Sequence, residues 1–211
     1  MPALRLVLAS NNATKLSELR SLLGGLAVEL VAQGELGIGE AEEPHITFIE
    51  NALAKARLAA AAAGAAAIAD DSGICVDALG GAPGVISAHY AGLSPPAGER
   101  EAQRRVQDAA NNELLLQRLR DQAERRAHFV CTLVALRHAA DPQPLVAVGR
   151  WPGLILESPR GEGGFGYDPL MWIPELGATV AELGADAKNR HSHRARAMAQ
   201  MRILLQDVWR L

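Results

Sequence analysis

The sequence lacks the excess of positive charge that is typical of proteins held on nucleic acid by bulk electrostatics. Its 211 residues include 21 Lys and Arg against 24 Asp and Glu, which gives a formal net charge of −3. Because that kind of binding depends on a surplus of basic side chains that neutralise phosphates, we expect no nucleic-acid partner. Single basic residues can still act at a local phosphate site.

Cysteine is also scarce. The two cysteines, Cys75 and Cys131, each lie within an apolar stretch. Two cysteines do not build a disulfide framework, and neither has metal-type spacing with a histidine or with the other cysteine. We therefore expect both to be small buried hydrophobic residues.

No hydrophobic run is long enough to predict a membrane span. The first 20 residues hold one short apolar run that stops at Ser10-Asn11-Asn12, which is typical neither of a signal peptide nor of a span. The stretch around residues 59–69 is rich in alanine, which is only weakly apolar, and Asp70-Asp71 end it. We expect no membrane partner and a cytoplasmic location.

Strand-like and helix-like segments alternate along the chain. The sequence is 49% hydrophobic and 21% charged, without internal repeats or linker-like segments, so we expect a single domain, 1–211, possessing an ordinary globular core. Apolar runs predict strands at 4–9, 26–31, 65–69, 74–79, 129–136 and 145–155. Periodicity and capping residues predict helices at 16–23, 47–64, 98–120 and 192–208. The interleaving predicts an α/β fold with a mixed sheet.

The first candidate site is the turn after the first predicted strand, Ser10-Asn11-Asn12-Ala13-Thr14-Lys15. Backbone N–H groups at a helix start carry partial positive charge and can hold phosphate oxygens. A lysine one turn into the helix would complete such a cradle. The alternative is a plain N-cap followed by a solvated lysine. The turn is not a P-loop, because G-x-x-x-x-G-K-[ST] occurs nowhere in the chain.

A second candidate site is Asp70-Asp71-Ser72-Gly73, directly after an apolar run. Ligands in open α/β sheets tend to bind at the carboxyl ends of strands. Two adjacent acids suit a hard cation such as Mg²⁺, and an aspartate there could orient or deprotonate a water. The alternative is that one acid caps a turn and the other is solvated.

A nearby loop carries three further acids, Glu40, Glu42 and Glu43. Alone, such a loop is usually a solvated surface. It gains a role only if the fold brings it beside Asp71, because two carboxylates, triphosphate oxygens and water would fill an octahedral Mg²⁺ site.

The fourth candidate site is split between a glycine-rich loop at 163–169 and a basic segment further along the chain. Glycines let a backbone approach a ligand closely, and Phe165 or Tyr167 offers a stacking face for a base. In the basic segment, Lys188 supplies a point charge for phosphate, and His193 can donate a hydrogen bond to a base or accept one from it. Arg194 supplies a guanidinium for a planar acceptor. The alternative is an ordinary turn followed by a basic helix start, although basic residues there oppose the helix dipole.

Together these segments resemble the inosine triphosphate pyrophosphatase family, whose members remove dITP, ITP and XTP. The blocks that carry the resemblance keep the family's order and spacing over nearly the whole chain: Ser10–Lys15 with Glu18, Thr47–Asn51, Ala69–Gly73 with Val76–Leu79, Gly81–Gly84 with Ser87-Ala88, Gly163–Pro169 and Ser192–Arg194. Each block is a weak or moderate signal alone, whereas the ordered set is highly specific. Two positions depart from the pattern: His89 stands where the family usually has arginine, and Ala195 replaces a glycine.

The resemblance implies an elongated, twisted mixed sheet with flanking helices, in two lobes around a nucleotide-binding cleft, and a homodimer. Carried over by position, residues 10–15 would hold the triphosphate. Asp71 would bind Mg²⁺ together with Glu42, or with Glu43 as the alternative, and would activate the attacking water. The remaining substrate contacts would come from Ser72 and, for the base and neighbouring groups, from Phe165, Gly166, Tyr167, Asp168, Lys188, His193 and Arg194.

The expected reaction is hydrolysis of dITP, ITP and XTP or dXTP to the monophosphate and pyrophosphate, by attack of water on the α-phosphorus. One alternative is a related pyrophosphatase acting on modified pyrimidine or methylated nucleotides. Another is a nucleotide-binding regulator without turnover. The joint presence of Lys15, Glu42 and Asp71 argues against a regulator, because a sensor needs no acid that activates water.

Overall fold

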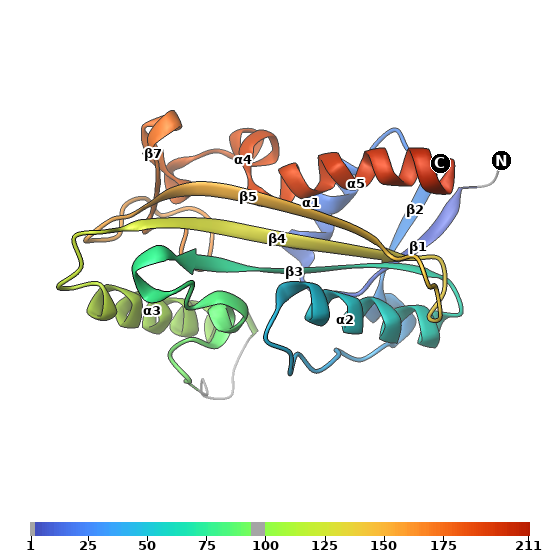
Figure 1. Ribbon diagram of the computed structural model, residues 1–211, viewed down its shortest axis with the longest axis horizontal. Coiled ribbons are helices and arrows are strands. Elements are labelled where there is room, and N and C mark those ends of the chain that lie inside the picture. The colour runs from blue at the N-terminus through green and yellow to red at the C-terminus, as the bar shows by residue number, and fades with distance from the viewer. Residues whose placement is uncertain (1–2, 94–99) are drawn as a thin grey trace. The chain divides into compact units, whose positions relative to one another are not determined.

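The chain has an α/β fold built on a mixed sheet, which confirms the predicted fold class. The computed structural model describes residues 3–93 and 100–211 and, within them, all side chains except those of residues 13, 14, 100 and 101. In these ranges seven strands are hydrogen-bonded in the order β2-β1-β3-β4-β5-β6-β7 (Figure 1). β1 pairs in parallel with β2 and β3, whereas β6 pairs antiparallel with β5 and β7. The strands are β1 (Leu4–Leu8), β2 (Val28–Ala32), β3 (Ala66–Val76), β4 (Arg126–Leu136), β5 (Leu145–Ile155), β6 (Met171–Ile173) and β7 (Ala178–Thr179).

Capping residues set the ends of the long helices. Thr47 accepts a hydrogen bond from the N–H of Glu50 and begins α2, and Gly64, at φ 58°, ends it. Ser192 accepts one from Ala195 and begins α5. The α-helices are α1 (Ala13–Leu22), α2 (Phe48–Ala63), α3 (Arg100–Arg118), α4 (Ala185–His191) and α5 (His193–Trp209). Short 3₁₀ turns are η1 (Gln33–Leu36), η2 (Asp77–Leu79), η3 (Gly84–His89), η4 (Pro174–Leu176) and η5 (Val180–Glu182).

The main correction to the predicted elements concerns β3. The sequence predicted two strands separated by Asp70-Asp71, whereas β3 is continuous from Ala66 to Val76, and residues 77–79 form η2 instead of a strand end. Cationic side chains from distant elements pair with both aspartates, so the strand passes through them without a turn. The short elements β6, β7 and α4 were not predicted, and the predicted helix start at Gly98 lies outside the described residues. Cys131 is buried as expected, but Cys75 is only half-buried.

The chain divides into two compact units, and β3, β4 and β5 contribute residues to both. The first unit comprises Met1–Asp71, Cys131–Arg150 and His191–Leu211, and the second comprises Ser72–Val130 and Trp151–Arg190. In the first unit, α2 covers one face of the strands while α1 and α5 cover the other (Figure 1). The α2 face is lined by alanines, which let the helix approach the strands closely.

The second unit has a core of its own. Trp151, Leu115, Leu119 and Ile74 are at most 1% exposed and pack with residues of β4, β5 and β6. Tyr167, from the glycine-rich loop, belongs to the same cluster. None of the helices in the described residues is long and apolar enough to cross a membrane.

Candidate active site

Asp70 and Asp71 point to opposite faces of the sheet, because successive side chains of a strand alternate. Asp70 lies on the same face as Ile68, which packs with α1 and α5. Asp71 lies on the same face as Ala69, which packs with α2. Asp70 is 1% exposed and Asp71 is 5% exposed. The two adjacent acids therefore do not converge on one cation, as their position at a strand end had suggested.

On the α1 and α5 face, two cations surround Asp70. Lys15 Nζ lies 3.0 Å from Asp70 Oδ1, and Arg194 Nη2 lies 3.6 Å from Oδ2. Burial alone would raise the pKa of Asp70, but Lys15, Arg194 and, more weakly, Lys55 outweigh it and hold the pKa well below its ordinary value. Asp70 is therefore an ionised anchor for cations.

Arg194 is itself 3% exposed and lies one residue into α5, whose N-cap is Ser192. Its guanidinium pairs with Glu18 of α1 as well as with Asp70. Burial lowers the pKa of Arg194, but the carboxylates of Asp70 and Glu18 raise this pKa by more than burial lowers it. The side chain therefore stays charged. Arg194 therefore belongs to the ion-pair network around Asp70.

On the α2 face, Lys55 holds Asp71. Lys55 Nζ lies 2.8 Å from Asp71 Oδ1 and 2.9 Å from Glu43 Oε1. Burial lowers the pKa of Lys55, and Asp71, Asp70 and Glu43 more than reverse that effect. Burial raises the pKa of Asp71, and Lys55 opposes the rise. The two aspartates thus have pKa values displaced in opposite directions.

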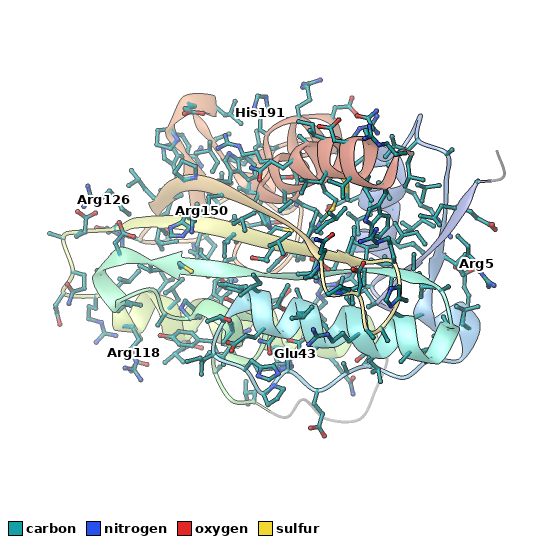
Figure 2. The ribbon with its side chains drawn as sticks, turned by 45° about the vertical axis from the view of Figure 1, so that its right-hand side comes forward. Arg5, Glu43, Arg118, Arg126, Arg150 and His191 are labelled. Carbon is teal, nitrogen blue, oxygen red and sulfur yellow. The ribbon has the colours of Figure 1, made fainter. Side chains whose placement is uncertain are left out.

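Asn51 brings the acidic loop to Asp71. Its amide accepts from the N–H of His45 at 3.0 Å, donates to the carbonyl of His45 at 3.2 Å, and lies 3.5 Å from Asp71 Oδ2. Figure 2 labels Glu43 beside α2. Both candidate glutamates are exposed, but Glu43 pairs with Lys55, which also holds Asp71, so Glu43 is the one that ion pairs connect to Asp71.

Sequence reasoning missed Lys55. Its position was a usable signal, because Lys55 lies at helical spacing from Ala52, Ala56 and Ala59, all 0% exposed. A lysine on such a buried face needs an anionic partner.

The donors around Asp71 fit a hard divalent cation. Asp71 and Glu43 already share one cation, the ammonium of Lys55. In the ranges that the structure describes, no group of three or more His, Cys, Asp or Glu residues could hold a metal ion. Two carboxylates completed by substrate phosphates and water are a donor set with which proteins bind Mg²⁺.

The turn at residues 10–15 caps α1. Asn12 Oδ1 accepts the N–H of Lys15 at 3.2 Å, and Ser10 Oγ accepts the N–H of Asn12 at 3.2 Å. Ala13 and Thr14 are the first two residues of the helix. The turn contains an N-cap, but Lys15 is not simply solvated, because it pairs with Asp70.

The side chain of Asn11, in the same turn, contacts the acidic loop. Its amide donates to Glu40 at 3.3 Å, and a Cβ on Gly34 would lie 2.5 Å from its Oδ1. Glycine at position 34 therefore permits this close approach.

The glycine-rich loop of the second unit folds around Asp168. Asp168 Oδ2 accepts the N–H of Phe165 at 3.0 Å and lies 2.8 Å from Lys188 Nζ of α4. A Cβ on Gly164, whose φ is 76°, would lie 2.1 Å from the same oxygen. Gly164 thus makes room for the carboxylate that organises the loop.

The two aromatic residues of this loop have different environments. Tyr167 is 5% exposed and donates a hydrogen bond to the carbonyl of Ser87 at 2.8 Å. Phe165 is half-buried, and the cationic groups of Arg104 and Lys188 lie 4.4 and 5.1 Å from its ring centroid. Of the two stacking candidates, Phe165 is therefore the accessible one.

Two further predicted substrate residues, Ser72 and His193, are next in sequence to Asp71 and Arg194. Ser72 is a half-buried residue of β3. His193 is the first residue of α5 and is half-buried. A Cβ on Gly149 would lie 2.0 Å from the His193 carbonyl oxygen, so glycine in β5 lets the helix start approach that strand.

Comparison with known proteins gives matches over almost the whole chain. A sequence model of the Ham1 family matches residues 6–204. The dITP/XTP pyrophosphatase of Methylibium petroleiphilum is 69% identical over 206 residues, which cover 98% of this chain and 99% of that protein. The dITP/XTP pyrophosphatase of Leptothrix cholodnii is 67% identical over 211 residues, covering 99% and 100% of the two chains.

Solved structures agree with these matches. A HAM1 protein from Coxiella burnetii has a TM-score of 0.88 at 40% identity and covers 97% of this chain and 100% of its own. The Ham1 protein of Staphylococcus aureus has a TM-score of 0.81 at 35% identity, with coverage of 96% and 98%.

Proposed function

The chain belongs to the Ham1 family, and we propose from that membership that it is a pyrophosphatase acting on non-standard purine nucleoside triphosphates. Its substrates would be dITP, ITP and XTP or dXTP, and its products the corresponding monophosphate and pyrophosphate. Removal of such nucleotides would cleanse the nucleotide pool. A homodimer and a cytoplasmic location remain predictions.

The structural observation that carries the proposed mechanism is the separation of the ion pairs: Lys15 and Arg194 pair with Asp70, whereas Lys55 joins Asp71 to Glu43. Neighbouring carboxyl groups whose surroundings displace their pKa values in opposite directions are typical of a site where one acid exchanges a proton and the other stays charged. Asp70, with its lowered pKa, would hold Lys15 and Arg194 in place. Asp71, whose pKa is raised by burial, would be the proton acceptor of the two.

The proposed reaction is in-line attack of water on the α-phosphorus. Asp71 would orient the water and take its proton, while Lys15 and the N–H groups at the start of α1 would offset negative charge on the triphosphate. Lys55, between Asp71 and Glu43, would position the carboxylate of Asp71.

For the cofactor, we propose Mg²⁺ held by Asp71 together with Glu43 or Glu42. The shared cation on Asp71 and Glu43 supports Glu43. When bound, the ion would polarise the phosphate and lower its negative charge.

For the base and neighbouring groups, we propose contacts from Phe165 to Asp168, Lys188, His193 and Arg194. Phe165 would supply the stacking face, and polar groups would donate hydrogen bonds to O6 of a 6-keto purine. Adenine carries an amino group there and would leave the donors unpaired, so ATP should be a poor substrate. Guanine also has a 6-keto group, and its rejection must come from the 2-position.

The direct test is pyrophosphate release from ITP, XTP, dITP, GTP and ATP, each with Mg²⁺ and with a chelator. We expect metal-dependent turnover of the first three and far slower turnover of GTP and ATP. Preference for a modified pyrimidine nucleotide would favour the related pyrophosphatase. Nucleotide binding without product would indicate a regulator and contradict the proposal.

A further inference from the structure

One face of α3 contacts the glycine-rich loop through three residues spaced four apart, Arg104, Asp108 and Asn112. Residues at that spacing lie above one another on a helix. Asp108 Oδ2 accepts the N–H of Gly166 at 2.7 Å, and Asn112 Nδ2 donates to the carbonyl of Gly166 at 2.9 Å. Arg104 lies over the ring of Phe165. The helix therefore reaches both residues at the tip of the loop, within the second unit.

The two hydrogen bonds fix the peptide groups on either side of Gly166. Its N–H belongs to the peptide shared with Phe165, and its carbonyl belongs to the peptide shared with Tyr167. Gly166 has φ 61°, in the left-handed region, and a Cβ there would meet nothing within 4 Å. Glycine has more rotational freedom than any other residue, and α3 removes that freedom at this position.

Asp108 is a half-buried carboxylate, and burial is unfavourable for its charged form. Burial raises the pKa of Asp108, while the N–H of Gly166 and the charge of Arg104 act in the opposite direction. Charge-assisted hydrogen bonds are shorter and stronger than neutral ones. The short contact to Gly166 is therefore a strong constraint on the orientation of the Phe165 peptide.

We propose that Asp108, together with Asn112, is a positioning residue for purine selectivity, which fixes the Phe165–Gly166 backbone and hence the ring against which the base stacks. The inference rests on the proposed function, in which this loop binds the base. Asp108 need not touch substrate for this role. Its effect should appear in discrimination between bases and in KM, whereas the chemical step depends on Asp71.

The test compares Asp108→Ala and Asp108→Asn with wild type on ITP, GTP and ATP. We expect Asp108→Ala to raise KM for ITP and to lower the ratio of kcat/KM for ITP over ATP by about tenfold, the magnitude of one charged hydrogen bond. The kcat for ITP should change by less than about threefold, since the variant leaves the phosphate network intact. Asp108→Asn keeps an acceptor oxygen and should restore most of the selectivity. Glu113→Gln removes an exposed carboxylate from the same helix and should match wild type.

The outcomes separate the two proposals. If wild type does not hydrolyse ITP, the proposed function is wrong. If wild type is active and selective but Asp108→Ala keeps the same ratio between bases, the positioning role is wrong and the function stands. A fall of kcat for all three nucleotides by one factor would also overturn the role, because it indicates general loss of structure. If Asp108→Ala does not fold, Asn112→Leu removes the other hydrogen bond and should lower the same ratio.

Discussion

The two units hold their candidate residues by different physical means. In the first unit, side-chain charges hold one another: Lys15 and Arg194 pair with Asp70, and Lys55 pairs with Asp71 and Glu43. In the second unit, side chains hold the backbone, as in the bonds from Phe165 and Gly166 to Asp168 and α3.

The difference matches two kinds of recognition. Ion pairs between side chains can be exchanged for pairs with a ligand's charges, which suits a phosphate chain and a cation. A fixed backbone presents a fixed shape, which suits discrimination between flat bases of similar size. On this comparison, changes in the first unit should affect turnover and metal dependence, and changes in the second should affect the choice of base.

The largest effect should come from Asp71→Asn. The substitution keeps the size of the side chain but removes the proton acceptor and the charge, and we expect kcat to fall by about two to four decades. Steady-state pyrophosphate release from ITP measures it. The ratio of kcat/KM for ITP over ATP should stay within about threefold of wild type, since the loop that selects the base is unchanged.

Glu29→Gln, an exposed carboxylate on β2 of the same unit, is the matched control and should retain full activity. Near-normal hydrolysis by Asp71→Asn would remove Asp71 from the mechanism. A large change in base preference would instead break the proposed division between the units.

The next effect should come from Lys55→Met, which leaves two carboxylates without their shared cation. Removing one partner of a buried ion pair is strongly destabilising, so we expect the free energy of unfolding to fall by about 3 kcal/mol in the presence of a chelator. Millimolar Mg²⁺ should restore more stability to the variant than to wild type, because the ion no longer competes with Lys55. Urea unfolding with and without Mg²⁺ measures both changes.

Arg57→Met, an exposed cation on the same helix, should change stability by less than about 0.5 kcal/mol. If Mg²⁺ stabilises wild type and Lys55→Met equally, Asp71 and Glu43 do not form the cation site.

Local patterns predicted the parts of this fold that depend on local physics. The cap at Thr47 and the end of α2 at Gly64 follow from hydrogen bonding and backbone freedom within one turn. The Leu145–Ile155 strand was predicted with the observed bounds, because its apolar run stands between clear turn residues.

The predictions failed where distant residues decide the outcome. The predicted strand ended before Asp70-Asp71, because two adjacent acids are unfavourable in a buried strand unless cations compensate them. Those cations come from Lys15, Lys55 and Arg194, on three different helices, and no local pattern links them to β3.

The same limit applies to the glycine-rich loop. Its glycines were interpreted as room for a ligand, whereas in the structure Gly164 makes room for the carboxylate of Asp168. The residues that fix Gly166 precede it by 58 and 54 positions, on α3. Sequence spacing does not show which helix a loop will contact.

The smallest effect should come from the pair Gly164→Ala and Gly177→Ala. This pair tests whether side-chain bonds to the backbone hold the glycine-rich loop. Both glycines have left-handed φ angles, 76° and 61°, so each substitution carries a strain of about 1 kcal/mol. At position 177 a Cβ meets nothing within 4 Å, whereas at 164 it would displace the Asp168 carboxylate from Phe165 and Lys188. We therefore expect Gly164→Ala to lose about 2 kcal/mol in urea unfolding, twice the loss at 177, and to raise KM for ITP while kcat changes little. Equal losses of stability and an unchanged KM in both variants would mean that Asp168 does not organise this loop for the base. The proposed contrast between ion pairs in the first unit and side-chain bonds to the backbone in the second would then be wrong.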